Sequence, residues 1–361
     1  MHDLKKEENV ALLVGIDTDG DINTSMDELE ELAHTAGIKV AGRLVQKRDK
    51  PSAATYLGKG KLEELDDMMW QNEPTMLIFN DELTPAQFRN LTDKFDCAVI
   101  DRTLLILDIF AMGASSAEGK LQVELAQLRY RLTRLTGMGK MLSRLGGGIG
   151  TRGPGETKLE VDRRRVKERI SQLQRGIENI FKSRKTRRSL RQKRALPLIS
   201  IVGYTNAGKS TLLNALTNAS ALTEDKLFAT LEPLSRRLRF PKEREVIVSD
   251  TVGFIRDLPK GLLTAFGATL EELHSADLLL HVVDAGEEAA ETRLSAVEGI
   301  LENLGLLQKP RLLVWNKADK APAKAEQLRL RYGGVALSAH TGEGLEALLF
   351  EAARYLFVHK P

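Results

Sequence analysis

Residues 203–210 read GYTNAGKS and have the types and spacing expected of a phosphate-binding loop. They fit the pattern G-x-x-x-x-G-K-[ST], and residues 197–216 around them have the pattern of a strand, a loop and a helix. Glycines such as Gly208 let backbone amides wrap phosphate oxygens at a helix N-terminus. We expect Lys209 to reach the β- and γ-phosphates, the Ser210 hydroxyl to ligate Mg²⁺, and Thr211 to belong to the same nucleotide-binding set.

A second segment, EVIVSDTVGF at 245–254, is an apolar strand followed by a turn. We expect Asp250 to hold Mg²⁺ through water and the Gly253 amide to sense the γ-phosphate. Thr230, in LFATLEP at 227–233, stands where a switch threonine would close on Mg²⁺ and the γ-phosphate. Lys209, Thr230 and Gly253 are therefore the predicted catalytic set; the alternative for Thr230 is an ordinary loop threonine.

Two later segments predict selectivity for guanine. RLLVWNKAD at 311–319 is a strand that ends in Asn316, Lys317 and Asp319. The Asp319 carboxylate would accept hydrogen bonds from guanine N1–H and N2–H₂, which adenine does not offer. VALSAHTGEGL at 335–345 places Ser338 and Ala339 where a backbone amide contacts guanine O6. These motifs in this order, each at the end of a strand, predict a Mg²⁺-dependent enzyme that binds GTP and GDP and hydrolyses GTP.

Two departures within these motifs bear on catalysis. Phe254 follows the D-x-x-G segment, where many GTPases carry a glutamine that orients the attacking water. An apolar side chain does not do this, so we expect slow hydrolysis until a partner or an ion assists. Asn206 lies inside the phosphate-binding loop, as in GTPases that use K⁺ to neutralise charge in the transition state, so K⁺ is a further candidate cofactor.

The residues before 115 have the pattern of a small α/β domain. Apolar runs at 9–16, 38–46, 75–81 and 96–102 alternate with helical patterns at 27–36, 59–70 and 85–94. Strands that alternate with helices indicate β-α-β units and a parallel sheet. Together with the phosphate-binding segment, this places the chain in the α/β class, with an N-terminal domain at 1–115 and a Ras-like G domain at 195–361.

Residues 116–194 between these domains predict a long antiparallel helical hairpin. Leucines recur at heptad spacing before the glycine-rich stretch, and apolar residues resume this spacing after it: Leu121, Leu125, Leu128, Leu132, Leu135 and Leu142, then Leu159, Val166, Ile170, Leu173, Ile177 and Ile180. The stretch itself, 146–157, has six glycines and one proline. A simple connection needs one or two glycines, so we interpret the stretch as a small, adaptable tip that brings Arg152 close to a large surface. A linker without a role is the alternative.

The hairpin is also strongly basic. Residues 118–194 hold 22 lysines and arginines against 7 aspartates and glutamates, although the net charge of the whole chain is only +3. Such an excess is typical of a surface that contacts nucleic acid phosphates. For the run KSRKTRRSLRQKR at 182–194, a solvated helix end is the alternative.

Composition limits the remaining possibilities. The single cysteine, Cys97, excludes an internal disulfide, and its apolar neighbours favour a core thiol. No apolar run approaches the roughly 18 residues of a membrane span, and the N-terminus lacks the apolar segment of a signal peptide. We therefore expect a cytoplasmic protein with no membrane span, and a monomer in solution.

Several segments resemble the HflX family of translation-associated GTPases. They are GTRGPGETKLE at the hairpin tip, YLGKGK at 56–61, DKLFATLEP at 225–233 and DTVGFIRDLP at 250–259. The resemblance runs over nearly the whole chain, and the tip segment is its most specific part. It differs at Lys158, where the family usually has glutamine, and this makes the tip more basic.

The resemblance implies a function in translation. It implies that the GTP form binds the large ribosomal subunit and dissociates stalled or idle ribosomes, especially under stress, and that ribosomes stimulate weak basal hydrolysis. The tip would approach rRNA near the peptidyl-transferase region with Arg152 and Lys158 toward phosphates. Lys59 and Lys61 are further candidates for rRNA contact, or simply begin a helix.

Two other functions are compatible with the residues. One is a signalling switch whose N-terminal domain recruits a protein partner while the basic hairpin anchors it nonspecifically. The other is an RNA-modifying GTPase, but such enzymes need a catalytic cysteine or a cofactor domain, and Cys97 is the only cysteine.

Overall fold

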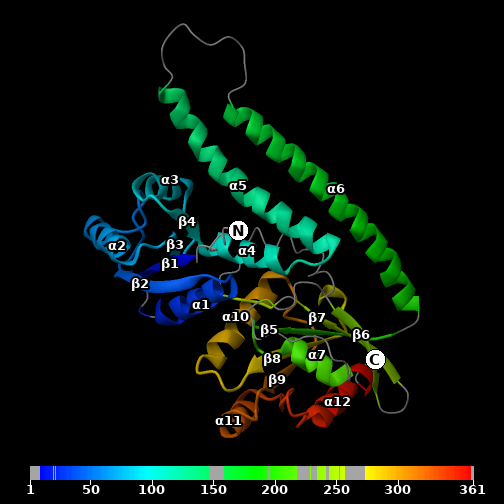
Figure 1. The fold of residues 1–361 in the computed structure, drawn as a ribbon. Helices are drawn as coiled ribbons and strands as arrows, with labels where there is room; N and C mark the ends of the chain where they lie inside the picture. The colour runs from blue at the N-terminus through cyan, green and yellow to red at the C-terminus, as the bar shows by residue number, and fades with distance from the viewer. Residues whose placement is uncertain are drawn as a thin grey trace, which may run out of the picture. The chain divides into compact units, whose positions relative to one another are not determined.

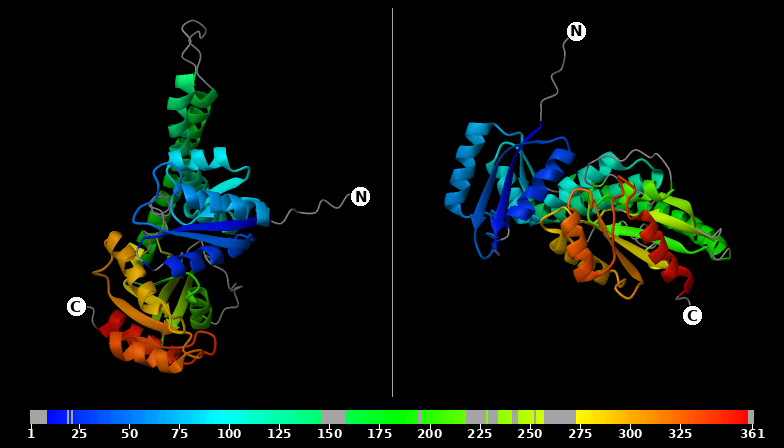
Figure 2. Two further views of the ribbon diagram at one scale, coloured as in Figure 1. Left: turned by 90° about the vertical axis from the view of Figure 1, so that its left-hand side faces the viewer. Right: turned by 90° about the horizontal axis from the view of Figure 1, so that it is seen from below.

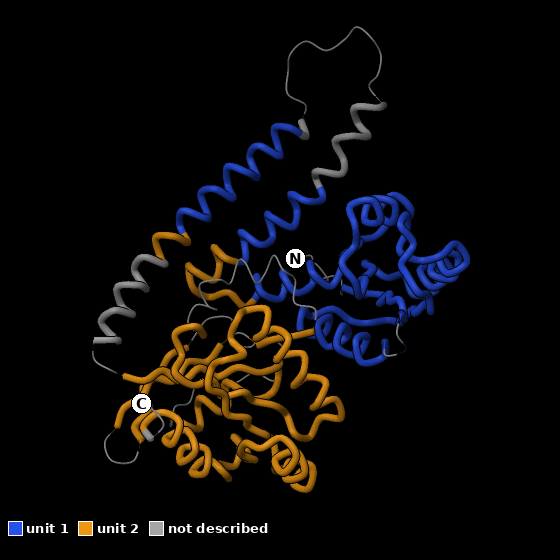
Figure 3. Tube along the Cα trace, turned by 180° about the vertical axis from the view of Figure 1, so that it is seen from behind, with its two compact units in different colours: residues 1–112, 123–176 blue, residues 113–122, 177–361 orange. Residues whose placement is uncertain are grey.

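The computed structural model describes residues 9–18, 20, 22–145, 158–193, 196–217, 228, 234–240, 244–251, 253–256 and 273–358, with the backbone alone at 135–145, 158–159 and 181–193. Contacts divide the chain into two compact units, residues 1–112 with 123–176 and residues 113–122 with 177–361 (Figure 3). The division passes through both helices of the hairpin, and the domain boundaries near 115 and 195 remain predictions. Among the described residues, no helix is long and apolar enough to cross a membrane.

The first unit contains a four-stranded parallel sheet of order β2-β1-β3-β4, as the sequence predicts (Figure 1). Its elements are β1 (Val10–Asp17), α1 (Ile22–Thr35), β2 (Lys39–Lys47), α2 (Lys59–Asn72), β3 (Met76–Phe79), α3 (Pro85–Lys94), β4 (Ala98–Asp101) and α4 (Arg102–Gly113). α3 begins with a capping box, in which Thr84 and Gln87 satisfy each other's backbone amides and Pro85 follows the cap. The sequence pattern did not identify α4, because LLILDIF is apolar apart from Asp108 and lacks a helical period.

Alternate residues of these strands supply the core of the unit. Leu12, Val14 and Phe79 pack with Leu62 and Leu65 of α2 in one apolar cluster. Cys97 lies at the edge of this cluster and is only partly buried, so the prediction of a core thiol holds in part. Burial raises the pKa of the Cys97 thiol, which lowers the fraction of reactive thiolate.

The hairpin helices are α5 (Ala117–Leu145) and α6 (Lys158–Lys193), and they run side by side in both Figure 1 and Figure 2. Predicted heptad residues Leu125, Ile170, Leu173 and Ile177 are buried. Arg169 of α6 donates two hydrogen bonds to the carboxylate of Glu124 of α5, at 2.7 and 2.9 Å. The predicted helical hairpin is therefore confirmed, with its apolar face turned inward.

Asp101 fixes α5 to the end of β4 within the first unit. This fully buried carboxylate accepts hydrogen bonds from the amides of Leu83 and Leu104, from the Tyr130 hydroxyl and from Arg134, at 2.5–3.0 Å. The Arg134 guanidinium also lies 3.3 Å from the centroid of the Tyr130 ring. One buried charge thus has four donors, as a buried ion requires.

The second unit contains a six-stranded mixed sheet of order β10-β9-β8-β5-β7-β6. Its elements are β5 (Leu198–Gly203), α7 (Lys209–Thr217), β6 (Leu234–Phe240), β7 (Arg244–Asp250), β8 (Leu278–Asp284), α10 (Ala290–Asn303), β9 (Arg311–Asn316), α11 (Pro322–Tyr332), β10 (Val335–Ala336), α12 (Leu345–Ala353) and the π-helical turn η2 (Arg354–Val358). The strand β6 pairs antiparallel with β7 at one edge, and the other pairings are parallel.

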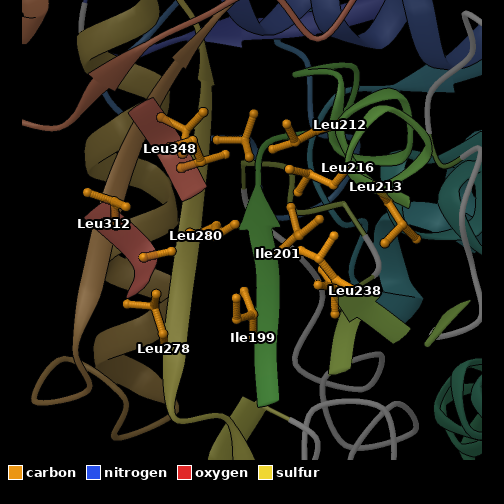
Figure 4. Packing of buried hydrophobic residues seen from close by; sticks show 14 of the residues in the cluster. Ile199, Ile201, Leu212, Leu213, Leu216, Leu238, Leu278, Leu280, Leu312 and Leu348 are labelled. Atoms are coloured by element: carbon orange, nitrogen blue, oxygen red, sulfur yellow. The ribbon is translucent and has the colours of Figure 1, made fainter. Parts of the chain in front are cut away.

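Helices cover both faces of this sheet. Figure 4 shows Ile199, Ile201 and Leu280 of the central strands packed with Leu212 of α7 and Leu348 of α12. On the other face, residues of α10 and α11 pack against Val283 and Trp315. Because β5, β7, β8, β9 and β10 are parallel neighbours, their carboxyl ends meet at one edge, where the motifs of the sequence lie.

His281 is an unusual buried group on the central strand β8. It is fully buried, and neither ring nitrogen has a hydrogen-bond partner among the described residues. Burial, together with the nearby charges of Arg311 and Lys209, lowers the pKa of His281 to about 3. The ring is therefore neutral at physiological pH.

Candidate guanine-nucleotide site

The phosphate-binding loop joins β5 to α7, as the sequence predicts. Gly203 has φ +154°, and a Cβ there would lie 2.2 Å from the carbonyl oxygen of Val282 on the neighbouring strand. Gly208 has φ +87°, and a Cβ there would lie 2.3 Å from Asn316 Nδ2. Both positions therefore exclude side chains by backbone conformation and by space. Asn206 is exposed in the same loop and has φ +59°.

Lys209 and Gly253 lie together, as expected of a phosphate-sensing pair. Lys209 Nζ donates to the carbonyl oxygen of Tyr204 at 2.6 Å, and a Cβ on Gly253 would lie 2.9 Å from this Nζ. The pKa of Lys209 is lowered to about 8: burial is the main cause, the charge of Asp250 opposes the shift, and the charge of Lys317 adds to it. The Lys209 ammonium is therefore held within the loop, where phosphate oxygens would compensate its buried charge.

Ser210 and Asp250 form the pair expected at a Mg²⁺ site. Ser210 Oγ donates to Asp250 Oδ2 at 2.8 Å, although the residues are 40 positions apart. No group of three or more His, Cys, Asp or Glu side chains that could hold a metal occurs in the described part of the chain. One carboxylate and one hydroxyl fit Mg²⁺, which keeps several waters and takes its other ligands from substrate phosphates.

Phe254 turns into the protein. Its side chain is 2% exposed, its amide donates to Gly203 O at 3.1 Å, and its carbonyl accepts from the Thr205 amide at 2.8 Å. The segment after Gly253 is thereby paired with the phosphate-binding loop. The side chain that replaces the usual glutamine serves packing in this structure.

The guanine motif comprises Asn316, Lys317 and Asp319, and these residues differ in burial and in hydrogen-bond partners. Asn316 is buried, its Nδ2 donates to Ala207 O at 2.8 Å, and its Oδ1 accepts from the Ala339 amide at 3.0 Å. It therefore connects the phosphate-binding loop to the segment of Ser338 and Ala339. Lys317 forms a 2.8 Å ion pair with Asp284.

Asp319, in contrast, is exposed. A hydrogen bond from the Ser338 hydroxyl lowers the pKa of the Asp319 carboxyl, which stays ionised and able to accept hydrogen bonds from a base. The predicted contact of the Ala339 amide with guanine O6 remains a prediction, and in this structure that amide donates to Asn316. Thr211 lies in the first turn of α7 and is half-buried.

The remaining predicted residues lie outside the described part of the structure or in the first unit. Thr230 and Arg152 lie outside the described residues, and Lys158 begins α6 with only its backbone described. Lys59 and Lys61 begin α2 in the first unit. Lys61 forms a 2.8 Å ion pair with Glu64, so much of its charge is already compensated.

Three residues that the sequence analysis did not single out lie at the site. Asp284 holds Lys317, Tyr204 lies inside the phosphate-binding loop, and the guanidinium of Arg293 is 4.7 Å from the Tyr204 ring centroid. A signal for Asp284 was available, since LLLHVVD at 278–284 is an apolar strand that ends in a carboxylate. No local pattern marks the pairing of Tyr204 with Arg293.

Comparison with known proteins agrees with these motifs. Family models described as GTP-binding GTPase N-terminal, GTP-binding GTPase Middle Region and 50S ribosome-binding GTPase match residues 23–111, 113–191 and 198–317. A protein named GTPase HflX from Caldanaerobacter subterraneus subsp. tengcongensis is 50% identical over 99% of this chain and 83% of its own length. That of Escherichia coli is 44% identical over 90% of this chain and 77% of its own length.

Among solved structures, a GTP-binding protein from Sulfolobus solfataricus in complex with GDP is 26% identical, with a TM-score of 0.48 over 98% of this chain and 100% of that chain.

Proposed function

The chain belongs to the GTPase HflX family, and we propose that its GTP form binds the large ribosomal subunit and dissociates stalled or idle ribosomes into subunits. The chain is a P-loop GTPase of a 50S ribosome-binding family. The observation that carries the proposal is a basic helical hairpin in the same chain as the guanine-nucleotide site. Ile170 and Leu173 of α6 are buried, while Arg165, Lys167 and Arg175 are exposed, so this helix offers positive charge to solvent.

The proposed contact with rRNA is made by the tip at 146–157, with Arg152 and Lys158 toward phosphates and Lys59 and Lys61 as further contacts. Small residues let the backbone approach a folded RNA closely, and the arginine supplies charge and donors. Lys61 contributes less than Lys59, because Glu64 already pairs with it. We also propose a cytoplasmic monomer, since one chain carries both the nucleotide site and the basic hairpin.

The nucleotide chemistry is hydrolysis of GTP to GDP and phosphate by attack of water on the γ-phosphorus. Lys209 would bind the β- and γ-phosphate oxygens, Ser210 and Asp250 would hold Mg²⁺, and Asp319 would select guanine. Bound Mg²⁺ would neutralise charge on the phosphate oxygens. The Gly253 amide, which lies beside the Lys209 ammonium, would contact the γ-phosphate, and Thr230 would do so as well.

Basal hydrolysis is proposed to be slow, because Phe254 is buried and does not orient water. The exposed Asn206 is proposed to help bind K⁺ beside the phosphates. Hydrolysis should then be faster in K⁺ than in Na⁺ at equal ionic strength, and Asn206→Ala should remove the difference. Equal rates in both salts would exclude the K⁺ proposal.

The test of ribosome dissociation is sedimentation of intact ribosomes with this protein on a density gradient, with a non-hydrolysable GTP analogue or with GDP. We expect the protein to travel with the large subunit, and ribosomes to separate, with the analogue alone. The Arg152→Ala/Lys158→Gln variant should lose both effects and keep nucleotide binding. Its matched control is Arg237→Ala/Arg239→Ala, which removes two exposed charges from β6. Protein that stays at the top of the gradient in both states would refute the proposal and favour another partner.

A further inference from the structure

The loop 284–287 after β8 is attached to the guanine motif. Asp284 Oδ2 pairs with Lys317 Nζ at 2.8 Å, and its Oδ1 accepts from the Gly286 amide at 2.9 Å. The Ala285 amide donates to Asn316 O at 2.9 Å. Two residues of the guanine motif therefore fix the first half of this loop.

The second half of the loop is connected to the phosphate-binding loop by Arg293 of α10. Glu287 forms an ion pair with Arg293, and both side chains are largely buried. The guanidinium of Arg293 lies 4.7 Å from the centroid of the Tyr204 ring. A guanidinium at this distance attracts the face of an aromatic ring and restricts its position.

Tyr204 contacts Lys209 and the segment 253–256 that carries Gly253. Its carbonyl oxygen accepts from Lys209 Nζ at 2.6 Å. Its hydroxyl accepts from the Arg256 amide at 2.7 Å, and its backbone forms a parallel bridge with Phe254. Tyr204 is only 6% exposed, and these contacts fix its position against Lys209 and segment 253–256.

We infer that Tyr204 and Arg293 are positioning residues for GTP hydrolysis. Through loop 284–287 they set segment 253–256, with its γ-phosphate-sensing Gly253, against Lys209 and the guanine motif. GDP lacks the γ-phosphate, so its binding does not depend on where Gly253 lies. Loss of the positioning contacts therefore weakens discrimination between GTP and GDP and slows hydrolysis, while guanine binding persists.

The experiment compares Tyr204→Phe and Arg293→Lys with the unaltered protein, in the absence of ribosomes. The first change removes only the hydroxyl, and the second keeps a charge for Glu287 but removes the flat group over the ring. The readouts are the Kd values of a non-hydrolysable GTP analogue and of GDP, and the single-turnover rate of hydrolysis. We expect each variant to lose about three- to tenfold in analogue affinity relative to GDP and in rate, as expected for one hydrogen bond or one stacked cation.

Arg331→Ala is the matched control. Arg331 also pairs with a glutamate, Glu291, at 2.7 Å, and lies 5.0 Å from the ring centroid of a tyrosine, Tyr332, on α11. It should leave the analogue-to-GDP ratio and the rate unchanged. An unchanged ratio in Tyr204→Phe, equal weakening of GDP and analogue, or the same effect from Arg331→Ala would each overturn the inference. Since ribosomes are absent, the outcome does not depend on the proposed ribosomal function.

Discussion

Asn316 and Asp319 belong to one sequence motif, but the structure predicts opposite consequences when they are changed. Asn316→Ala leaves the buried carbonyl of Ala207 and the buried amide of Ala339 without their side-chain partner. Each buried group without a partner costs about 1–3 kcal/mol, so we expect the G domain to lose about 2–6 kcal/mol of unfolding free energy. Asp319→Ala changes an exposed residue and should cost less than about 1 kcal/mol.

For nucleotide binding we expect the opposite: Asp319→Ala impairs binding directly, whereas Asn316→Ala impairs it through lower folding stability. Asp319→Ala removes the carboxylate proposed to accept two guanine donors, and charge-assisted hydrogen bonds contribute about 1.5–3 kcal/mol each. We expect GTP affinity to fall by about a hundredfold or more without loss of folding. Asn316→Ala should weaken GTP binding as well, but through a domain that has become less stable.

The assay is urea unfolding without nucleotide, because bound nucleotide would stabilise the folded state by mass action. The chain has two tryptophans, Trp70 in the first unit, 87% exposed, and Trp315, fully buried beside Asn316. In a Trp70→Phe background, the fluorescence of Trp315 reports the G domain. With a slope of about 2 kcal/mol per M urea, Asn316→Ala should lower the unfolding midpoint by about 1–3 M.

Asn303→Ala is the matched control, since Asn303 is an exposed asparagine at the end of α10. Its midpoint should match that of the parent protein. The reasoning is refuted if Asn316→Ala unfolds at the same urea concentration as Asp319→Ala, because the two buried hydrogen bonds would then have no net effect.

Three further outcomes follow from the described contacts. Phe254→Gln should destabilise the G domain by about 2–4 kcal/mol, because it puts an amide into the core, and should not raise the single-turnover rate; a faster rate would show that the side chain reaches the site. Asp101→Asn should cost the first unit about 3–5 kcal/mol by breaking a buried pair with Arg134, seen as faster hydrogen exchange in β4 and α5; exchange equal to that of the exposed Asp66→Asn would contradict this. The pKa of His281 is about 3 in the folded protein against the ordinary 6.5, so as the pH falls the unfolded chain takes up a proton at His281 before the folded chain does. The free energy of unfolding is therefore highest above pH 6.5 and falls by about 1.4 kcal/mol per pH unit between pH 6.5 and 3. His281→Leu should flatten this part of the pH profile of urea midpoints, and an unchanged slope would exclude His281 as its source.

The sequence by itself determined the fold class and the identity of the nucleotide. The phosphate-binding loop and the guanine motif are local patterns whose function follows from the residues within them. Gly203 and Gly208 have positive φ angles, and the glycines at these two positions are already part of the phosphate-binding pattern. The hairpin was predictable for the same reason, because each of its helices carries its own heptad spacing of apolar residues. The helix α4 was not recognised, because it carries no helical period, and the edge strand β6 was not recognised although its last four residues alternate between exposed arginine and buried apolar side chains.

The tertiary structure decided which motif residues are exposed at the site and which hold the site together. Asn316 reaches the phosphate-binding loop, 109 residues away, only because β9, β8 and β5 are neighbours in the sheet. Strand order likewise brings Ser210 to Asp250, and Arg293 lies against Tyr204 because α10 packs on the face next to β8. Such pairings depend on strand order and on the packing of whole helices. A single segment of sequence does not contain this information, because its partners are chosen by the rest of the chain.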